Sequence, residues 1–272
     1  MKSGKKRKLK KIILFFLLLI PVLFLWSLLI EPNILIVKKY RIENEKLRGI
    51  RAVFAGDFHF RPYQGNRLNY TVKKINAQNA DIILFIGDYV NRHSIDTSYP
   101  MTEIAKKLAE IKPSKKIFTV LGNHDCYQDK KKIKKELVNA GVEVLENSTR
   151  YVRVKDRLIS VSGIEDLTTG FPNVEKTLRL SISPTILLTH QPDIFYKIPQ
   201  KVDLILAGHT HGGQVRIPFF GPVFVPSVYG TRFAYGLIKE EGKKMIVTNG
   251  IGTSILPIRF NCFPEIVVID FI

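Results

Sequence analysis

The chain contains little cysteine, and its acidic residues are far outnumbered by basic ones. Cys126 and Cys262 are its two cysteines and form no C-x-x-C pair, which excludes a disulfide-rich scaffold and a zinc finger. Low-complexity tracts and acidic tails are absent too, while hydrophobic residues make up 45% and charged residues 24% of the 272 residues. These values match an average globular protein and exclude a disordered chain. We expect one domain of ordinary size with an appendage.

The deficit of acid indicates the kind of partner. The chain has 42 Lys and Arg against 24 Asp and Glu, a formal charge of +18, and residues 1–11 hold seven of the basic side chains and no acid. Such a charge attracts phosphorylated substrates and anionic membrane surfaces. Nucleic acid is not an expected partner, because no basic helix or aromatic platform stands out.

An uncharged apolar run, IILFFLLLIPVLFLWSLLI, follows the basic segment over residues 12–30. As a helix it would span about 28 Å, close to the thickness of the bilayer core. A cleaved signal peptide is disfavoured, because the run exceeds the usual signal core and no A-x-A-like site follows. We predict an uncleaved N-terminal transmembrane or membrane-anchor helix over residues 12–30, a linker over 31–48 and a globular domain over 49–272.

The basic segment also predicts an orientation. By the positive-inside rule the N-terminus lies in the cytoplasm, and a single pass through the cell membrane places the domain outside it. If the apolar run lies in the membrane interface instead, the domain stays on the cytoplasmic face.

Short, continuously apolar runs alternate with helix-like stretches in the first part of the domain. The predicted strands are 50–56, 81–87, 116–122, 142–146, 157–163, 185–190 and 202–208, and the predicted helices are 67–79, 101–111 and 129–141. This alternation predicts an α/β fold with parallel pairing. Four later runs, GQVRIPFF, TRFAYGLIK, KKMIVTN and EIVVIDFI, predict strands of a second, more antiparallel sheet.

Side chains that ligate metals gather directly after the predicted strands. They are Asp57 and His59, then Asp88, then Asn123, and after two later strands His190, His209 and His211. Because ligands bind at the carboxyl ends of strands in open α/β sheets, we expect these side chains to meet at one edge. With His124, next to Asn123, five of the six histidines lie in these motifs, which chance clustering does not explain. Donors of the Asp, Asn and His types without thiolate suit manganese, iron or zinc.

The motif order D-x-H, G-D, G-N-H-D, H and G-H-x-H, from Asp57 to about Gln214, resembles that of the calcineurin-like metallophosphoesterases. The resemblance implies a two-sheet mixed β sandwich flanked by helices, and a centre of two divalent metal ions, manganese first and iron or zinc as alternatives. It implies that Asp57, His59 and His211 hold one ion, that Asn123, His190 and His209 hold the other, and that Asp88 bridges them.

The resemblance also indicates residues that act on the substrate. His124 is the candidate general acid or phosphate contact, and Asp125 either orients its imidazole or caps a helix. Asn91 and Arg92 are candidate phosphate contacts, although a capping Asn and a surface Arg are equally ordinary. Protein serine/threonine phosphatases of this fold carry G-D-x-x-D-R-G, and Asn91 departs from that pattern, which disfavours protein phosphatase activity.

The stretches GHTHGGQVRIP and 250–271 resemble the small membrane-anchored bacterial branch of the family. The favoured function is that of an envelope phosphodiesterase, which hydrolyses a phosphodiester or pyrophosphate bond of a small-molecule or lipid substrate with metal-activated hydroxide, beside membrane lipids. The alternative is a UDP-2,3-diacylglucosamine pyrophosphatase of lipid A biosynthesis, which requires the cytoplasmic face. A nuclease and a non-catalytic scaffold are less favoured, and the oligomeric state is not predicted.

The segment IPFFGPVFVPSVYG, residues 217–230, is rich in Pro, Gly and large apolar side chains. It forms either an apolar lip suited to lipid or a loop buried against the second sheet. The buried loop is favoured, because aromatic runs usually lie in a core.

Overall fold

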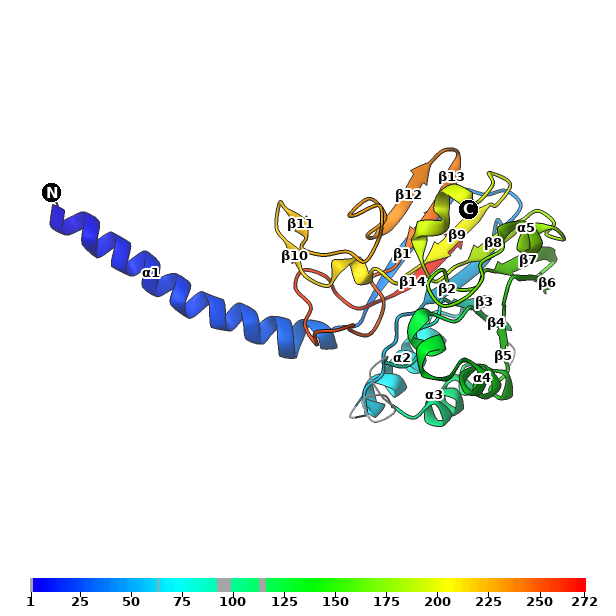
Figure 1. Ribbon diagram of the computed structural model, residues 1–272, viewed down its shortest axis with the longest axis horizontal. Coiled ribbons are helices and arrows are strands. Elements are labelled where there is room, and N and C mark those ends of the chain that lie inside the picture. The colour runs from blue at the N-terminus through cyan, green and yellow to red at the C-terminus, as the bar shows by residue number, and fades with distance from the viewer. Residues whose placement is uncertain (1, 63, 92–98, 113–115) are drawn as a thin grey trace.

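Two mixed six-stranded sheets pack face to face, and a long N-terminal helix projects from the body that they form (Figure 1). The computed structural model describes residues 2–62, 64–91, 99–112 and 116–272; within residues 2–16 it describes the side chains of residues 7, 8, 10, 11 and 14.

The first sheet has the strand order β1-β14-β2-β3-β4-β5. Its strands are β1 (Ile36–Ile42), β2 (Arg51–Ala55), β3 (Ile82–Phe85), β4 (Lys116–Thr119), β5 (Val142–Val144) and β14 (Glu265–Phe271). Strands β2 to β5 run parallel, as their alternation with helices requires. Strand β14 runs antiparallel to β2 and parallel to β1, with Ile36 opposite Glu265.

The second sheet has the order β12-β13-β9-β8-β7-β6. Its strands are β6 (Ser148–Val154), β7 (Arg157–Gly163), β8 (Thr185–Leu188), β9 (Leu204–Ala207), β12 (Gly236–Glu240) and β13 (Lys243–Val247). Strands β7, β8, β9 and β13 run parallel to one another, while β6 and β12 close the two edges as antiparallel hairpin strands. A small separate hairpin pairs β10 (Arg216–Ile217) with β11 (Gly221–Pro222).

Apolar side chains fill the space between the sheets, among them Phe54, Leu84 and Leu206, all fully buried. Burying each such side chain contributes about 1.5–3 kcal/mol. The outer faces are covered by α2 (Gly65–Asn76), α3 (Met101–Leu108) and α4 (Asn123–Asn139) on the first sheet, and by α5 (Val174–Leu178) and a 3-10 helix (Pro192–Lys197) on the second. In α3, Ile104 and Leu108 lie one helical turn apart and bury one stripe against the sheet.

The predicted α/β architecture with two mixed sheets is confirmed, and three details differ. Strand β14, expected in the second sheet, lies in the first between β1 and β2. Residues 36–42, expected within a linker, form β1. Helix α4 begins at Asn123 and bends at Asp129, so the predicted helix from residue 129 is its second part. The first two differences have one cause, since β1 pairs with β14, which lies more than 200 residues later in the chain, and β14 in turn pairs with β2.

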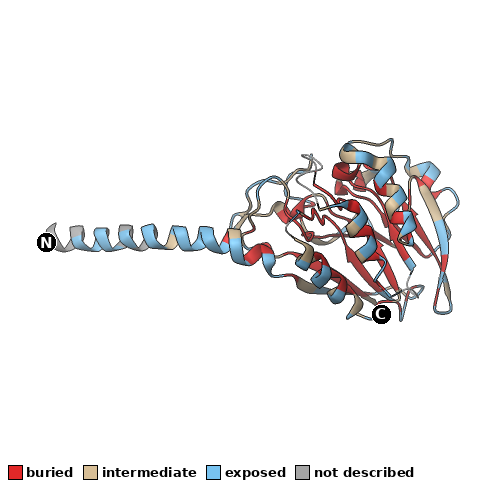
Figure 2. Cartoon of the chain, turned by 90° about the horizontal axis from the view of Figure 1, so that it is seen from below, coloured by how far each residue is buried: buried red, intermediate tan, exposed pale blue. Residues whose placement is uncertain are grey.

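Helix α1 (Lys2–Leu25) continues through a π-helical turn (Trp26–Ile30) and a 3-10 turn (Glu31–Asn33) to the start of β1. Its described apolar side chains are largely exposed (Figure 2). Of the helices within the described residues, none combines the length and the apolar content required to cross a membrane.

The base of this helix is fixed to the body by hydrogen bonds. The carbonyl of Ser27 accepts from the backbone N–H of Arg259 at 2.9 Å, and Oε1 of the buried Glu31 accepts from the backbone N–H of Cys262 at 2.5 Å. Trp26 Nε1 donates to Oε2 of the same carboxylate at 2.8 Å. The N-terminal helix therefore joins the body through a defined contact rather than through a free linker.

Candidate metal centre

The predicted metal ligands converge at the edge where β2, β3, β4, β8 and β9 end. Parallel strands present their carboxyl ends to the same edge of a sheet, and here both sheets contribute. Asp57 and His59 follow β2, Asp88 follows β3, Asn123 opens α4 after β4, His190 follows β8, and His209 and His211 follow β9. His209 is partly exposed, and the other six are buried.

The Asp88 carboxylate lies between two groups of donor atoms. Its Oδ2 is 3.4 Å from His59 Nε2 on one side and 3.3 Å from His190 Nε2 on the other. On the first side, His59 Nε2 is 3.1 Å from His211 Nε2, which in turn is 4.0 Å from Asp57 Oδ1. These atoms form a compact group of nitrogen and oxygen donors.

The second group forms around His190. Its Nε2 lies 3.1 Å from Asn123 Oδ1 and 3.2 Å from His209 Nδ1, while its Nδ1 faces the carbonyl of Ile86 at 2.7 Å. A contact of the second ring nitrogen with a carbonyl fixes the orientation of a metal-ligating imidazole. With Asp88 this side offers oxygen and nitrogen donors of the same kind as the first.

The donor set fits divalent cations. Ligand atoms lie within 4.8 Å of one another in three overlapping groups: Asp57, His59 and His211; His59, Asp88 and His124; Asp57, Asp88 and His190. Among the described residues, Nδ1 of His59 and of His211 are buried without a hydrogen-bond partner. Carboxylate and imidazole ligands without thiolate are typical of manganese, iron and zinc sites.

Five of the candidate ligands have a left-handed backbone, which L-residues seldom adopt. Their φ angles are 49° at Asp57, 41° at His59, 54° at Asp88, 68° at His209 and 50° at His211. The left-handed conformation costs roughly 1–2 kcal/mol per residue. Such strain clusters at functional sites, where the surrounding structure imposes it.

Two motif glycines make room for the ligands. A Cβ at Gly122 would lie 2.1 Å from Asp88 Oδ1 and 2.7 Å from His190 Cε1. A Cβ at Gly208 would lie 2.5 Å from Asp57 Oδ2. All three distances are shorter than real Cβ contacts, so the glycines of the G-N and G-H motifs are required by the approach of these side chains.

Burial sets the protonation of the centre. Burial, and then the neighbouring His124, lowers the pKa of His59 to about 3, and burial lowers the pKa of His209 to about 4, so both imidazoles are neutral at neutral pH. Burial raises the pKa of Asp57 to about 7, and Asp88 adds to this effect. Burial opposes a charge on His190, yet the adjacent Asp88 raises the pKa of His190 well above its usual value. Metals bind neutral imidazoles and ionised carboxylates, so cations would displace protons from Asp57 and His190.

A comparison with known families identifies this constellation. The profile described as calcineurin-like phosphoesterase matches residues 50–213, which include all seven candidate ligands. The chain belongs to this family.

Named relatives agree with the assignment. The chain is 31% identical over 249 residues to the uncharacterized metallophosphoesterase YkuE of Bacillus subtilis (strain 168), covering 88% of this chain and 86% of the relative. It is 32% identical over 199 residues to the phosphodiesterase YaeI of Escherichia coli (strain K12), covering 72% of each. An uncharacterized metallophosphoesterase of Aquifex aeolicus (strain VF5) is 32% identical over 255 residues, 88% of this chain and 93% of the relative. The protein is a metal-dependent phosphoester hydrolase.

The two candidate catalytic residues of this metallophosphoesterase take different places. His124 lies beside the centre, its ring 4.5 Å from that of His59 between centroids, and its backbone N–H donates to Asp88 Oδ1 at 2.9 Å. The Asp125 carboxylate accepts backbone N–H groups of Asp88 at 2.7 Å, Tyr89 at 2.8 Å and Gly122 at 3.1 Å. Asp125 thus caps the start of α4 and fixes the loop that carries Asp88.

The candidate phosphate contacts are only partly within the described structure. Asn91 is buried in the loop that follows Asp88, with 4% of its surface exposed. Arg92 lies outside the described residues.

The apolar segment 217–230 corrects a prediction. It was expected to pack as a buried loop, but Phe219 is fully exposed and Phe220 is 87% exposed. The segment forms the β10–β11 hairpin and the turns after it, and none of its residues is buried, although the Tyr229 ring contacts Tyr196 at 5.1 Å between centroids.

Sequence reasoning missed the loop over residues 249–262. The backbone N–H of Gly252 donates to the Asp57 carbonyl at 2.6 Å, and a Cβ at Gly250 would lie 2.5 Å from Asp57 Cβ. Fully buried Arg259 holds this loop, with bonds to the carbonyls of Asn249 at 2.8 Å and Cys262 at 2.9 Å. No short-range motif marks these residues as part of the centre. The sequence feature that pointed to them was the pair Gly250 and Gly252 ahead of Arg259.

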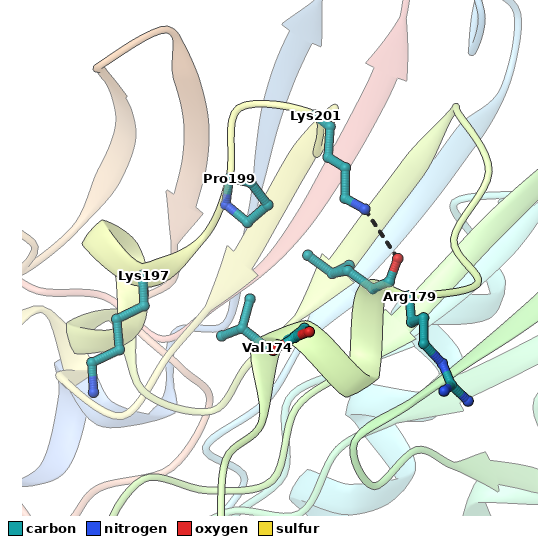
Figure 3. A pocket seen from close by; sticks show the side chains of 7 residues that line it. Val174, Arg179, Lys197, Pro199 and Lys201 are labelled. Carbon is teal, nitrogen blue, oxygen red and sulfur yellow. Dashed lines mark hydrogen bonds between the residues drawn. The ribbon is translucent and has the colours of Figure 1, made fainter.

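A separate hollow of about 470 Å³ lies on the outer face of the second sheet. It is lined by Val174 at the start of α5, by Arg179 directly after α5, and by Lys197, Pro199 and Lys201 (Figure 3). The ammonium of Lys201 donates to the carbonyl of Leu178 at 3.1 Å, so this lysine serves the local fold. None of the candidate metal ligands lines this hollow.

Proposed function

We propose that the chain is a membrane-anchored phosphodiesterase of the cell envelope that uses two metal ions. The observation that carries the proposal is the place of Asp88, whose Oδ2 is 3.4 Å from one group of donors and 3.3 Å from the other. A carboxylate shared in this way is the arrangement that a pair of cations requires.

Each group of donors would hold one ion. Asp57, His59 and His211 would hold the first, Asn123, His190 and His209 the second, and Asp88 would be shared. When bound, two such ions polarise phosphoryl oxygens and activate a water for attack on phosphorus. Manganese is the first choice for this donor set, with iron or zinc as alternatives.

His124 acts on the substrate in this proposal. Its imidazole contacts the phosphate or protonates the leaving oxygen, because it lies beside His59 and outside the two ligand sets proposed above. The Asp88 carboxylate holds its backbone, which fixes the imidazole relative to the centre. His124→Ala should therefore keep its metal content and lose turnover, and an unchanged rate would contradict this role.

Similarity and charge support the substrate and the location. A relative 32% identical is named a phosphodiesterase, which favours a phosphodiester substrate. The apolar run 12–30 after the basic residues 1–11 supports a membrane anchor, and the positive-inside rule then favours a domain outside the cytoplasm. Protease added to intact spheroplasts should digest the domain; protection until lysis would contradict this orientation.

Activity is tested on the full-length protein in detergent, stripped of metal and reloaded with manganese. Hydrolysis of bis(p-nitrophenyl) phosphate, lost in Asp88→Ala, is the expected result. Preferential release of UMP from UDP-2,3-diacylglucosamine would instead assign the pyrophosphatase alternative, which requires the cytoplasmic face. Failure to cleave either substrate with manganese bound would contradict the proposal.

A further inference from the structure

An apolar rim lies exposed next to the metal centre. We define it as Phe219, Phe220, Val223, Phe224, Ile255 and Leu256, which are between 56% and 106% exposed. Most exposed apolar side chains of a soluble protein are scattered singly, whereas a contiguous group of this size marks an interaction surface.

Hydrogen bonds join the two segments that carry the rim. Gln214 precedes the β10–β11 hairpin; its Nε2 donates to the Leu256 carbonyl at 3.2 Å, and its own carbonyl accepts from the N–H of Phe260 at 2.9 Å. The N–H of Val223 donates to the Val215 carbonyl at 3.0 Å and closes the hairpin. The rim is thus one surface built from two distant parts of the chain.

The rim lies between the metal centre and the base of α1. On one side Pro222 packs against the turn after His211, where a Cβ at Gly213 would lie 2.4 Å from Pro222 Cβ. On the other side, the loop that carries Ile255 contacts the helix through Arg259, whose N–H donates to the Ser27 carbonyl at 2.9 Å. Figure 1 shows the hairpin and the segment before β14 on the side of the body from which α1 emerges.

The backbone holds the rim side chains outward at a cost. Phe219 has φ 69° and Ile255 has φ 53°, in the left-handed region that bulky and β-branched residues seldom adopt. Neither side chain gains burial in return, since they are 106% and 73% exposed. Strain that brings no packing within the fold is expected where a surface is shaped for an external partner.

Charge and position identify that partner as a lipid bilayer. Residues 214–230 and 250–264 contain no Asp or Glu, so nothing in them repels an anionic headgroup layer. The loop that carries Ile255 and Leu256 is bonded to Ser27, within the apolar run 12–30, where Leu25 and Leu29 are also exposed. We propose that the rim inserts into the interface of the bilayer beside the base of α1, so that the domain rests on the membrane with its metal centre close to the headgroups. This inference rests on the membrane anchor proposed above, but not on the reaction.

Fluorescence quenching by brominated lipids tests the contact in the full chain. Trp26 is the single tryptophan, so a Trp26→Phe background permits one reporter at a time. Phe219→Trp places the reporter on the rim, and Tyr151→Trp places it on β6, half exposed and at the opposite end of the body (Figure 1). Both variants are reconstituted into phosphatidylcholine and phosphatidylglycerol vesicles with and without brominated phospholipid.

We expect brominated lipid to remove most of the emission of Phe219→Trp and none of that of Tyr151→Trp. Equal quenching of the two reporters would overturn the proposal. A blue-shifted emission at residue 219 without quenching would also overturn it, since a second copy of the chain or another protein would then cover the rim. As a second variant, Phe219→Asp with Phe220→Asp should abolish the quenching of a Val223→Trp reporter while leaving hydrolysis of a soluble diester in detergent unchanged.

Discussion

Replacing Gly122 with alanine should inactivate the enzyme more than it destabilises it. The new Cβ would lie 2.1 Å from Asp88 Oδ1 and 2.7 Å from His190 Cε1, whereas ordinary contact begins at 3.4 Å. One or both side chains must therefore move by about an ångström, and both are candidate ligands. Gly122 has φ −95°, which alanine adopts freely, so the clash alone is responsible for the effect.

The magnitude follows from the displacement. Misplacing a catalytic group by about 1 Å costs about 100-fold in rate. Overpacking at a rigid position costs about 1–3 kcal/mol of folding free energy. We therefore expect kcat/KM for bis(p-nitrophenyl) phosphate to fall by about 100-fold or more, with the protein still folded.

The assay measures hydrolysis, bound manganese and thermal unfolding of Gly122→Ala. The control is Gly141→Ala, at the end of α4, where φ is +78° and no atom lies within 4 Å of a Cβ. It should lose about 1 kcal/mol of stability through backbone strain and keep its activity. Full activity of Gly122→Ala at full manganese content would refute the placement of Asp88 and His190 in the centre.

Three further results are expected. In chemical unfolding of the metal-free protein, His209→Gly should be more stable than His209→Ala by about 1 kcal/mol, because glycine adopts the left-handed φ of 68° at this position without strain. A glycine variant less stable than the alanine variant would contradict backbone strain at His209. Manganese binding should release protons from Asp57 and His190, because burial raises the pKa of Asp57 to about 7 and Asp88 raises the pKa of His190. The affinity for manganese should therefore fall as the pH drops below 7. Calorimetry in buffers of different ionisation enthalpy measures the proton release, and its absence would count against these ligands. Arg259→Met should lower stability by about 3 kcal/mol in urea unfolding, because buried carbonyls lose a charged donor, whereas a change below about 0.5 kcal/mol would show that they find other partners.

The sequence predicted the parts of the fold that depend on local pattern. Strand β3 is a continuous apolar run before Gly87 and Asp88, and this combination of a buried strand and a tight turn can be recognised over a few residues. The convergence of ligands such as His59 and His190 followed from the same rule, because parallel strands end at one edge.

The remaining features depend on contacts between distant segments. The pairing of β1 with β14 joins Ile36 to Glu265, and no local periodicity specifies that register. The exposure of Phe219 could not be predicted either, since the aromatic content of a segment is the same for a buried loop and for a surface that binds a partner. The role of Arg259 depends on carbonyls that only the folded loop presents to it.

The central claim is that the strand ends form a site for two metal ions that hydrolyses phosphodiesters. The most direct measurement titrates the metal-stripped, full-length protein with manganese and records bound ions per chain together with hydrolysis of bis(p-nitrophenyl) phosphate. We expect two ions per chain, activity that rises with occupancy, and loss of both in Asp88→Ala. A single ion at saturation, or full hydrolysis without metal, would contradict the account.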